Sequence, residues 1–430
     1  MNKRFPLVSL FLALSLSACG PLRTSAPKLG AAVADSAAIR SDIAYLASDR
    51  LEGRLTGTPG NDSAAAYIAR RYKSLRLRAP YPGYMQKFVA RPAAAAHTGD
   101  TAGLATQNVV AILPGSDPAY AGKYIVLGAH FDHLGRSTQY ALDPDAKDAI
   151  RNGADDNASG TAALLQLARM LSVSRTRHSV MFVNFSGEEE GLLGSQYFVD
   201  HSPVPLDSIA LMLNFDMVGR LKDQKLFVYG TGTATELPAL VDSANAKSIE
   251  TFRIQGGGDG FGSSDHSSFY AKGIPVLHFF TDSHADYHRA TDDVEKIDAG
   301  GEARVVDLAW RMVESIDNRP ARLTFVRSTA PSRMGGRSQG SQVYLGSVPD
   351  MAAGTVPGLR LTGVRAGSPA EKGGLVADDI IVEFGGAAVS DLQSYSDALY
   401  SHKPGEVVKV VFLRGGKRME TTVTLGTRGG

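Results

Sequence analysis

The hydrophobic positions of this chain are gathered into short continuous runs rather than alternating with polar positions. Such runs are typical of fully buried strands, and they occur at 108–113, 123–129, 179–185, 210–216, 225–230 and 274–280. Segments with helical periodicity separate several of them, at 160–171, 194–200, 236–247 and 302–316. The alternation predicts an α/β domain in which helices cover both faces of a mostly parallel central sheet.

The flanking regions differ from this pattern. Residues 79–105 are rich in Ala, Pro and Gly and show little periodicity, which predicts an irregular excursion. Arginines interrupt Pro, Ser and Gly at 319–340, which indicates a solvated linker, with a membrane-facing basic segment as the alternative. Short strands and one helix near 391–400 then predict a second, β-rich α+β unit. The predicted main domain is 35–318 and the second unit is 341–430.

The amino end carries a further pattern. Lys3 and Arg4 precede an apolar stretch at 5–17, and Ala18 and the only cysteine, Cys19, follow it. This arrangement resembles a bacterial lipoprotein signal, 1–18, which implies cleavage before Cys19, lipidation of its thiol and a tether at 19–34. The expected location is the bacterial cell envelope, on the periplasmic or extracellular face. An ordinary secretory signal with an incidental cysteine is the alternative.

The charge balance bears on possible partners. The chain has 45 Lys and Arg residues against 44 Asp and Glu residues, giving a net charge of +1. Proteins that bind nucleic acid through its phosphates usually carry a basic excess, so nucleic acid is not expected as a partner.

Imidazole and carboxylate groups cluster where the predicted strands end. Parallel strands bring their carboxyl ends to one edge of a sheet, and neutral imidazole together with carboxylate binds divalent zinc well. We therefore expect a metal site there. The candidate groups in chain order are His130, Asp132, His133, Asp155, Asp156, Glu188, Glu189, Glu190, Asp216, His284 and His288.

Several motifs in this order resemble one family, the co-catalytic di-zinc exopeptidases typified by bacterial leucyl aminopeptidase. The matching stretches are AHFDH, GADDNASG, EEEGLLGS, NFDM and HRATDD, together with LEGRLTGTPG and SSDHSSF. The resemblance implies two Zn²⁺ ions per chain. It implies His130 and Asp216 as ligands of one ion, Glu189 and His288 as ligands of the other, and Asp155 as the bridge.

The resemblance also implies roles around the metals. Glu188 is expected to be the general base, and Asp132 to fix the tautomer of His130. Asp265 and His266 are expected to orient substrate or stabilise the oxyanion. A slip of one residue along the glutamate run onto Glu190 stays open.

The second unit resembles a PDZ domain of the bacterial envelope-protease kind. Tyr344, Leu345 and Gly346 match the carboxylate-binding loop, but Ser347 stands where an apolar residue is usual. Capture of a C-terminal peptide or partner protein and packing against the main domain are both open.

Together these features predict a membrane-anchored zinc aminopeptidase that releases amino-terminal residues from peptide substrates by attack of a zinc-bridging hydroxide. A carboxypeptidase or a glutaminyl cyclase of the same fold is the alternative within the family. A non-catalytic binding lipoprotein centred on the PDZ unit is the alternative from another class.

Overall fold

The structure is a computed structural model. It describes Met1 and the ranges 33–91, 103–138, 140–143, 145–258, 260, 262–327, 343–349, 358–364, 367–390 and 392–427. The predicted signal peptide, Cys19 and most of the predicted linker lie outside these ranges. Within them, no helix is both long enough and apolar enough to cross a membrane.

The larger domain is built on an eight-stranded mixed sheet with the order β1-β2-β4-β3-β5-β8-β6-β7. The central strands β4, β3, β5 and β8 are parallel to one another, whereas β2 is antiparallel to β4 and β6 is antiparallel to β8. The strands are β1 (Met85–Ala90), β2 (Leu104–Leu113), β3 (Tyr124–His130), β4 (Ser179–Phe185), β5 (Ile209–Phe215), β6 (Lys225–Tyr229), β7 (Arg253–Gly257) and β8 (Val276–Phe280).

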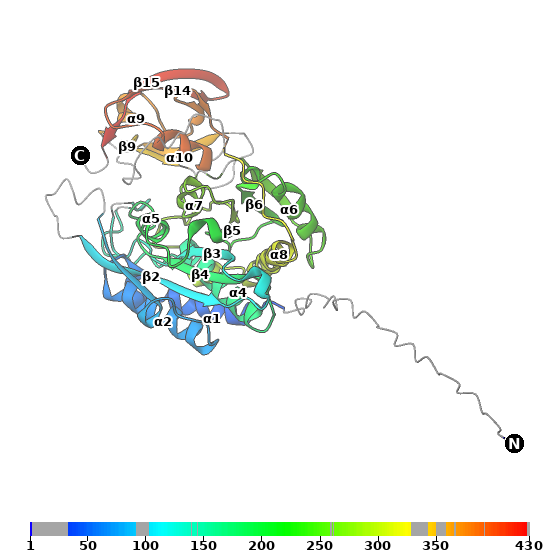
Figure 1. Cartoon of the computed structure of the whole chain (residues 1–430). Helices are drawn as coiled ribbons and strands as arrows, with labels where there is room; N and C mark the ends of the chain where they lie inside the picture. The colour runs from blue at the N-terminus through cyan, green and yellow to red at the C-terminus, as the bar shows by residue number, and fades with distance from the viewer. Residues whose placement is uncertain are drawn as a thin grey trace.

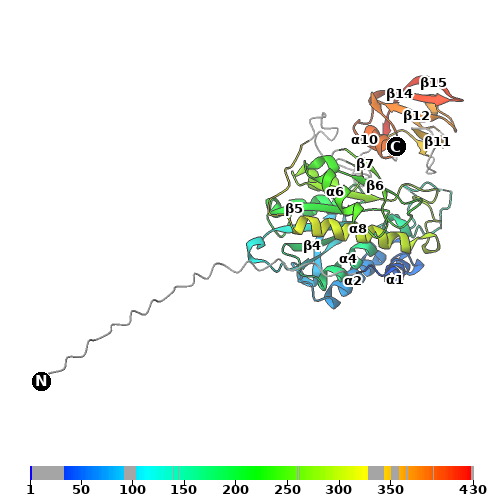
Figure 2. The same cartoon turned by 90° about the vertical axis from the view of Figure 1, so that its right-hand side faces the viewer.

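Helices cover both faces of this sheet (Figures 1 and 2). Helices α1, α2, α4 and α8 pack against one another on one face with α6 beside α8, and α5 packs on α7 on the other face. They are α1 (Ser36–Leu46), α2 (Pro59–Ser74), α4 (Gly160–Ser172), α5 (Leu193–Asp200), α6 (Leu237–Ala246), α7 (His266–Ala271) and α8 (Ala299–Asp317). Each face has its own apolar core, so the predicted α/β sheet sandwiched by helices is confirmed.

The prediction of an irregular excursion at 79–105 is wrong for part of that segment. Strand β1 forms there and pairs antiparallel with β2, in the register Met85 to Val109 and Ala90 to Leu104. The exposed and buried positions of β1 alternate, which is typical of a strand near the edge of a sheet. In the short run MQKFVA, Gln86 and Lys87 interrupt the apolar residues, so it lacks the continuous apolar pattern from which the other strands are predicted.

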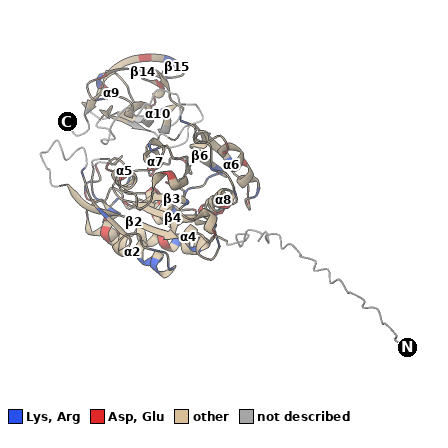
Figure 3. Cartoon of the chain, viewed as in Figure 1, with Lys and Arg blue, Asp and Glu red and all other residues tan. Residues whose placement is uncertain are grey.

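The smaller domain has a separate apolar core and an antiparallel sheet with the order β10-β11-β12-β14-β15. Strand β13 pairs with β12, and β9 pairs with β16. The elements are β9 (Val343–Tyr344), β10 (Ser347–Pro349), β11 (Leu359–Val364), α9 (Pro369–Lys372), β12 (Ile380–Phe384), β13 (Ala387–Ala388), α10 (Leu392–Tyr400), β14 (Val407–Arg414), β15 (Lys417–Thr424) and β16 (Gly426–Thr427). Basic and acidic residues are interspersed over both domains (Figure 3), in line with the near-zero net charge.

Candidate metal centre

The candidate site lies at the carboxyl ends of the parallel strands. His130 is the last residue of β3, and Asp216 comes directly after β5, which pairs with β3. The glutamates Glu188 and Glu189 follow β4 on the other side of β3. Parallel pairing therefore brings three chain segments together, as the strand pattern predicts.

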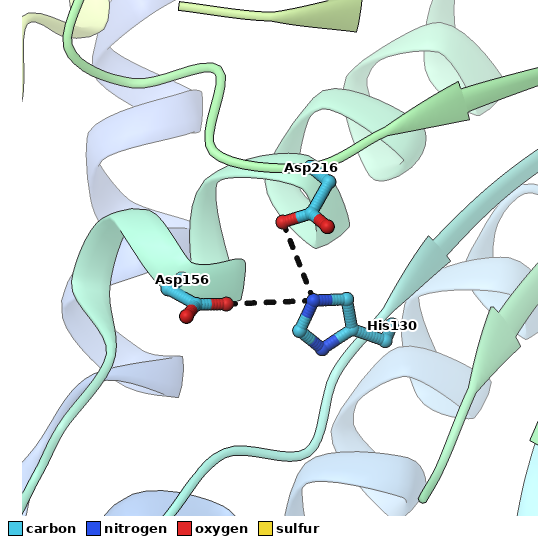
Figure 4. A group of neighbouring side chains, drawn as sticks. All are labelled: His130, Asp156 and Asp216. Atoms are coloured by element: carbon cyan, nitrogen blue, oxygen red, sulfur yellow. Dashed lines mark hydrogen bonds and ion pairs between the residues drawn. The ribbon is translucent and has the colours of Figure 1, made fainter. Parts of the chain in front are cut away.

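The Asp156 carboxylate lies between two histidines. Its Oδ1 is 3.4 Å from His130 Nε2, and its Oδ2 is 3.2 Å from His288 Nε2. His130 Nε2 is also 3.3 Å from Asp216 Oδ1, and Figure 4 shows both carboxylates directed at this one ring nitrogen. On the other side, His288 Nε2 is 3.2 Å from Glu189 Oε2. Asp156 thus has one oxygen in each of two neighbouring groups of ligand-type atoms.

These separations suit zinc. Tetrahedral coordination with bonds of about 2.0–2.2 Å places neighbouring donor atoms about 3.3–3.6 Å apart. The four separations above, 3.2–3.4 Å, agree with the lower end of that range to within about 0.1 Å. One ring nitrogen carries at most one proton, so it cannot donate to both Asp156 and Asp216. A shared cation satisfies both carboxylates at once, and the residues present fit the predicted metal.

The electrostatics of the two groups point the same way. Burial alone would lower the pKa of His130, but the carboxylates of Asp216 and Glu188 outweigh burial and raise that pKa well above its ordinary value. Burial would also lower the pKa of His288, but the carboxylates of Glu189 and Asp156 outweigh burial and raise that pKa well above its ordinary value. The pocket therefore has an excess of negative charge that a divalent cation would offset.

The structure places Asp156, rather than the predicted Asp155, between the two groups of ligand-type atoms. Asp155, predicted to bridge the metals, is fully buried and has other partners. Its Oδ1 accepts a hydrogen bond from the Gly219 backbone N–H at 2.7 Å, and its Oδ2 lies 3.1 Å from His284 Nε2. His284, the second candidate ligand, is thereby paired away from the centre. Asp156 has φ −101° and ψ 96°, and this extended backbone turns successive side chains to opposite sides.

Asp132 lies where the sequence predicts it, but its carboxylate has other partners. His130 Nδ1 is 3.2 Å from the Asp132 backbone oxygen and 3.8 Å from Oδ1 of its side chain. The carboxylate instead accepts from the Glu188 backbone N–H at 3.2 Å and from Thr56 Oγ1 at 2.9 Å. The carbonyl oxygen therefore orients the His130 ring, while the carboxylate holds the glutamate loop.

Glu188 lies at the centre without being among the close contacts of either histidine. Its Oε2 is 3.9 Å from His130 Nε2, and its side chain is 11% exposed. Burial raises the pKa of Glu188 well above its ordinary value. A carboxyl group that can accept and hold a proton near the metal ligands is what a general base requires. Glu190 also has a pKa raised by burial, to about 7, but it has no close contact with either histidine among the described residues.

Asp265 and His266 are buried rather than on an open surface. Asp265 is fully buried, and burial raises its pKa to about 7. The His266 ring is stacked on His278 at 4.4 Å between centroids. Their predicted contact with substrate stays a prediction.

Buried residues outside the predicted set hold the metal-site loops. Arg54 donates to the backbone oxygens of Phe131 at 2.7 Å, Asn152 at 2.6 Å, Gly153 at 3.0 Å and Leu46 at 2.5 Å. Its guanidinium thus ties the segment that carries His130 to the segment that precedes Asp156. The only sequence signal for this role was that Arg54 belongs to the LEGRLTGTPG motif.

Asp292 similarly holds the loop that carries Asp156. Its Oδ2 accepts the backbone N–H groups of Asp155 at 3.0 Å and Asp156 at 3.1 Å. Its place in the HRATDD motif was visible in the sequence, but nothing there indicated which backbone it would hold.

The segment predicted to be the carboxylate-binding loop joins β9 to β10 in the smaller domain. Tyr344 ends β9, and Leu345 is buried in the core of the smaller domain. Gly346 has a φ of +82°, and a Cβ there would meet the Ser368 side chain at 2.2 Å, so glycine is required. The Ser347 hydroxyl is 2.6 Å from the Tyr395 hydroxyl on α10.

Comparison with known proteins gives one family match for each of the two domains. Residues 108–313 match the model of peptidase family M28, and residues 343–425 match that of the PDZ domain. The larger domain is thus similar to peptidase family M28 over most of its length. The predicted family and the predicted PDZ domain are thereby confirmed, while the finer domain boundaries stay predictions.

Individual relatives are similar over part of their length. The chain is 31% identical over 185 residues to a probable leucine aminopeptidase 2 of Aspergillus oryzae, covering 41% of this chain and 34% of the relative. It is 28% identical over 314 residues to leupeptin-inactivating enzyme 1 of Streptomyces exfoliatus, covering 69% of this chain and 61% of that relative. The chain thus spans less than two thirds of these relatives.

Among solved structures, a zinc aminopeptidase of Bacillus subtilis superposes with a TM-score of 0.53 at 19% identity, covering 65% of this chain and 94% of that chain. At this identity the likeness shows the shared fold.

Proposed function

We propose that this chain is a zinc-dependent exopeptidase that releases amino-terminal residues from peptides. The observation that carries the proposal is the position of Asp156, with one oxygen near His130 and the other near His288. Two metal ions that share a carboxylate, beside a glutamate that ligates neither, form a site suited to hydrolysis of an acyl bond. The relatives named as aminopeptidases support the choice of bond.

In this proposal His130, Asp216 and Asp156 would hold the first zinc. Glu189, His288 and Asp156 would hold the second. Bound zinc would lower the pKa of a coordinated water toward about 7 and polarise the scissile carbonyl.

The chain's own residues move the proton. Glu188 accepts a proton from the attacking water, whose oxygen bonds to the carbonyl carbon, and gives a proton to the leaving amine as the C–N bond breaks. Asp132 keeps the Glu188 segment in place through the backbone N–H. Burial of Glu188 favours this exchange because it raises the pKa of the carboxyl group and so makes the protonated form easier to reach.

Product analysis tests the proposal. The purified full-length protein should release free amino acids from unblocked peptides, should fail on amino-acetylated copies, and should lose activity to a chelator and regain it with zinc. Release from the carboxyl end would favour a carboxypeptidase. Ammonia release from amino-terminal glutamine without cleavage would favour a glutaminyl cyclase. If zinc-loaded protein turned over no peptide, the result would favour a non-catalytic binding protein.

The amino-terminal pattern supports a second part of the proposal, a lipid anchor at Cys19 on the bacterial envelope. Cys19→Ser should move the protein from the membrane fraction to the soluble fraction without changing peptide turnover. Unchanged fractionation would contradict the anchor.

The smaller domain supports a third part, binding of a C-terminal peptide at the loop of Tyr344, Leu345 and Gly346. A substitution Ser347→Leu would remove the hydroxyl contact with Tyr395 and place an apolar residue beside the loop. We expect tighter binding of peptides with a free carboxylate, measured by fluorescence anisotropy, and no change for amidated copies. Equal binding of both peptide forms would contradict this part.

A further inference from the structure

His133 is fully buried, and its ring contacts a residue of the metal centre. Its Nδ1 lies 2.7 Å from Glu189 Oε1, while Glu189 Oε2 lies 3.2 Å from His288 Nε2. The two oxygens of Glu189 therefore have separate partners. The side chains of His133 and Glu189 are 0% and 5% exposed, so water does not compete for this contact.

We propose that His133 is a positioning residue, which holds Glu189 Oε1 so that only Oε2 is presented to zinc. The inference rests on the proposed function and deepens it.

The distances separate this role from that of a ligand. Two donors on one tetrahedral zinc lie about 3.3 Å or more apart. The His133–Glu189 separation of 2.7 Å is too short for that and is that of a strong hydrogen bond, whereas Asp156 Oδ2 is 3.7 Å from Nδ1. His288 Nε2, at 3.2 Å from both Glu189 and Asp156, is within about 0.1 Å of the spacing expected of a ligand.

The proton of His133 is assigned by its surroundings. An ionised carboxylate only accepts, so Nδ1 carries the proton that it donates to Glu189. The other nitrogen, Nε2, has no hydrogen-bond partner among the described residues.

The backbone around His133 is shaped to admit the ring. Gly153 has a φ of +56°, and a Cβ at this position would lie 2.5 Å from two carbons of the His133 ring. Only glycine leaves this space. The ring also meets the ring of His288 edge-on, with centroids 5.8 Å apart. Packing thus fixes the direction of Nδ1 before any metal binds.

A pair of amide substitutions tests the direction of the hydrogen bond. His133→Asn can place an amide N–H where Nδ1 lies, whereas His133→Gln places it near Nε2, and His133→Phe keeps the ring without a donor. Metal-free full-length protein would be titrated with zinc in competition with a fluorescent chelator. We expect one of two binding steps to weaken by about 10–100-fold in the Gln and Phe variants, the range for loss of a group that orients a ligand. The Asn variant should remain within a few-fold of wild type.

A double variant tests the connection to Glu189. Adding His133→Gln to Glu189→Gln should weaken zinc binding no further, because the hydrogen bond then has no ligand to position. Equal loss in the Asn, Gln and Phe variants would overturn the inference, as would wild-type affinity in all three. Wild-type protein that neither binds zinc nor cleaves peptides would contradict the proposed function instead.

Discussion

Asp155 and Asp156 are adjacent in the chain, yet their carboxylates have no shared partner among the described contacts. Asp155 meets Gly219 and His284, whereas Asp156 lies between His130 and His288. Asp292 holds the backbone N–H groups of both, so the two side chains diverge from one fixed point.

The divergence predicts different phenotypes for isosteric substitutions. Asp156→Asn removes one of two anionic oxygens, so zinc content and kcat should both fall. Asp155→Asn should retain two zinc ions and instead lower the free energy of unfolding by about 1–3 kcal/mol, since a buried hydrogen-bond acceptor is changed. Elemental analysis and urea unfolding distinguish the two. Loss of metal from Asp155→Asn with normal content in Asp156→Asn would restore Asp155 as the bridge.

The adjacent glutamates should also separate. Glu188→Gln should keep both metals while kcat falls by about 10²–10⁴, the range that general base catalysis supplies. Glu189→Gln should weaken one zinc, and added zinc should partly restore the rate. Steady-state kinetics at several zinc concentrations measure both effects. The opposite assignment of the two phenotypes would mean that the roles are shifted along the glutamate run.

Arg54 should affect metal binding without touching a ligand. Arg54→Met leaves backbone oxygens of Phe131, Asn152 and Gly153 without their donor. The loop after β3 and the loop before Asp156 are then no longer tied together by one side chain. We expect lower stability and weaker zinc binding, measured by calorimetry with and without zinc. Arg151→Met is the matched control, because Arg151 is equally buried but pairs with Asp143. Equal effects on zinc affinity in both variants would reduce Arg54 to a structural role.

Glu302 predicts a pH dependence of stability. It is fully buried on α8, neither carboxyl oxygen has a hydrogen-bond partner among the described residues, and burial raises its pKa well above the ordinary value. The folded state therefore binds this proton more tightly than the unfolded state does. Its contribution to stability is present below the unfolded pKa of about 4.3 and is lost as pH rises, by at most about 1.4 kcal/mol per pH unit.

Glu302→Gln should therefore be more stable than wild type at pH 7, and the difference should shrink toward pH 4. Urea unfolding of metal-free protein at several pH values measures it. Glu314→Gln on the same helix, where the side chain is only partly buried, should show no such trend. A pH-independent difference for Glu302→Gln would contradict the assignment of the trend to this carboxyl group.

The sequence predicted the central strands because each is a buried apolar run, and it predicted the site because ligand-type residues follow those runs. It did not predict β1, whose six residues are half exposed. Nor did it distinguish Asp155 from Asp156, since the local backbone decides which of two adjacent side chains faces the centre. The roles of His133 and Arg54 depend on contacts between loops far apart in the chain, which residue type and spacing do not encode.

Zinc stoichiometry measured together with activity tests whether Asp156 joins two zinc ions in one site. Metal-free full-length protein would be titrated with zinc while release of free amino acids from an unblocked peptide is followed. We expect two bound zinc ions per chain, with full activity reached only at the second equivalent, and we expect Asp156→Asn to lose both the second zinc and the activity. Full activity with one tightly bound zinc, or two zinc ions bound normally by Asp156→Asn, would contradict this expectation.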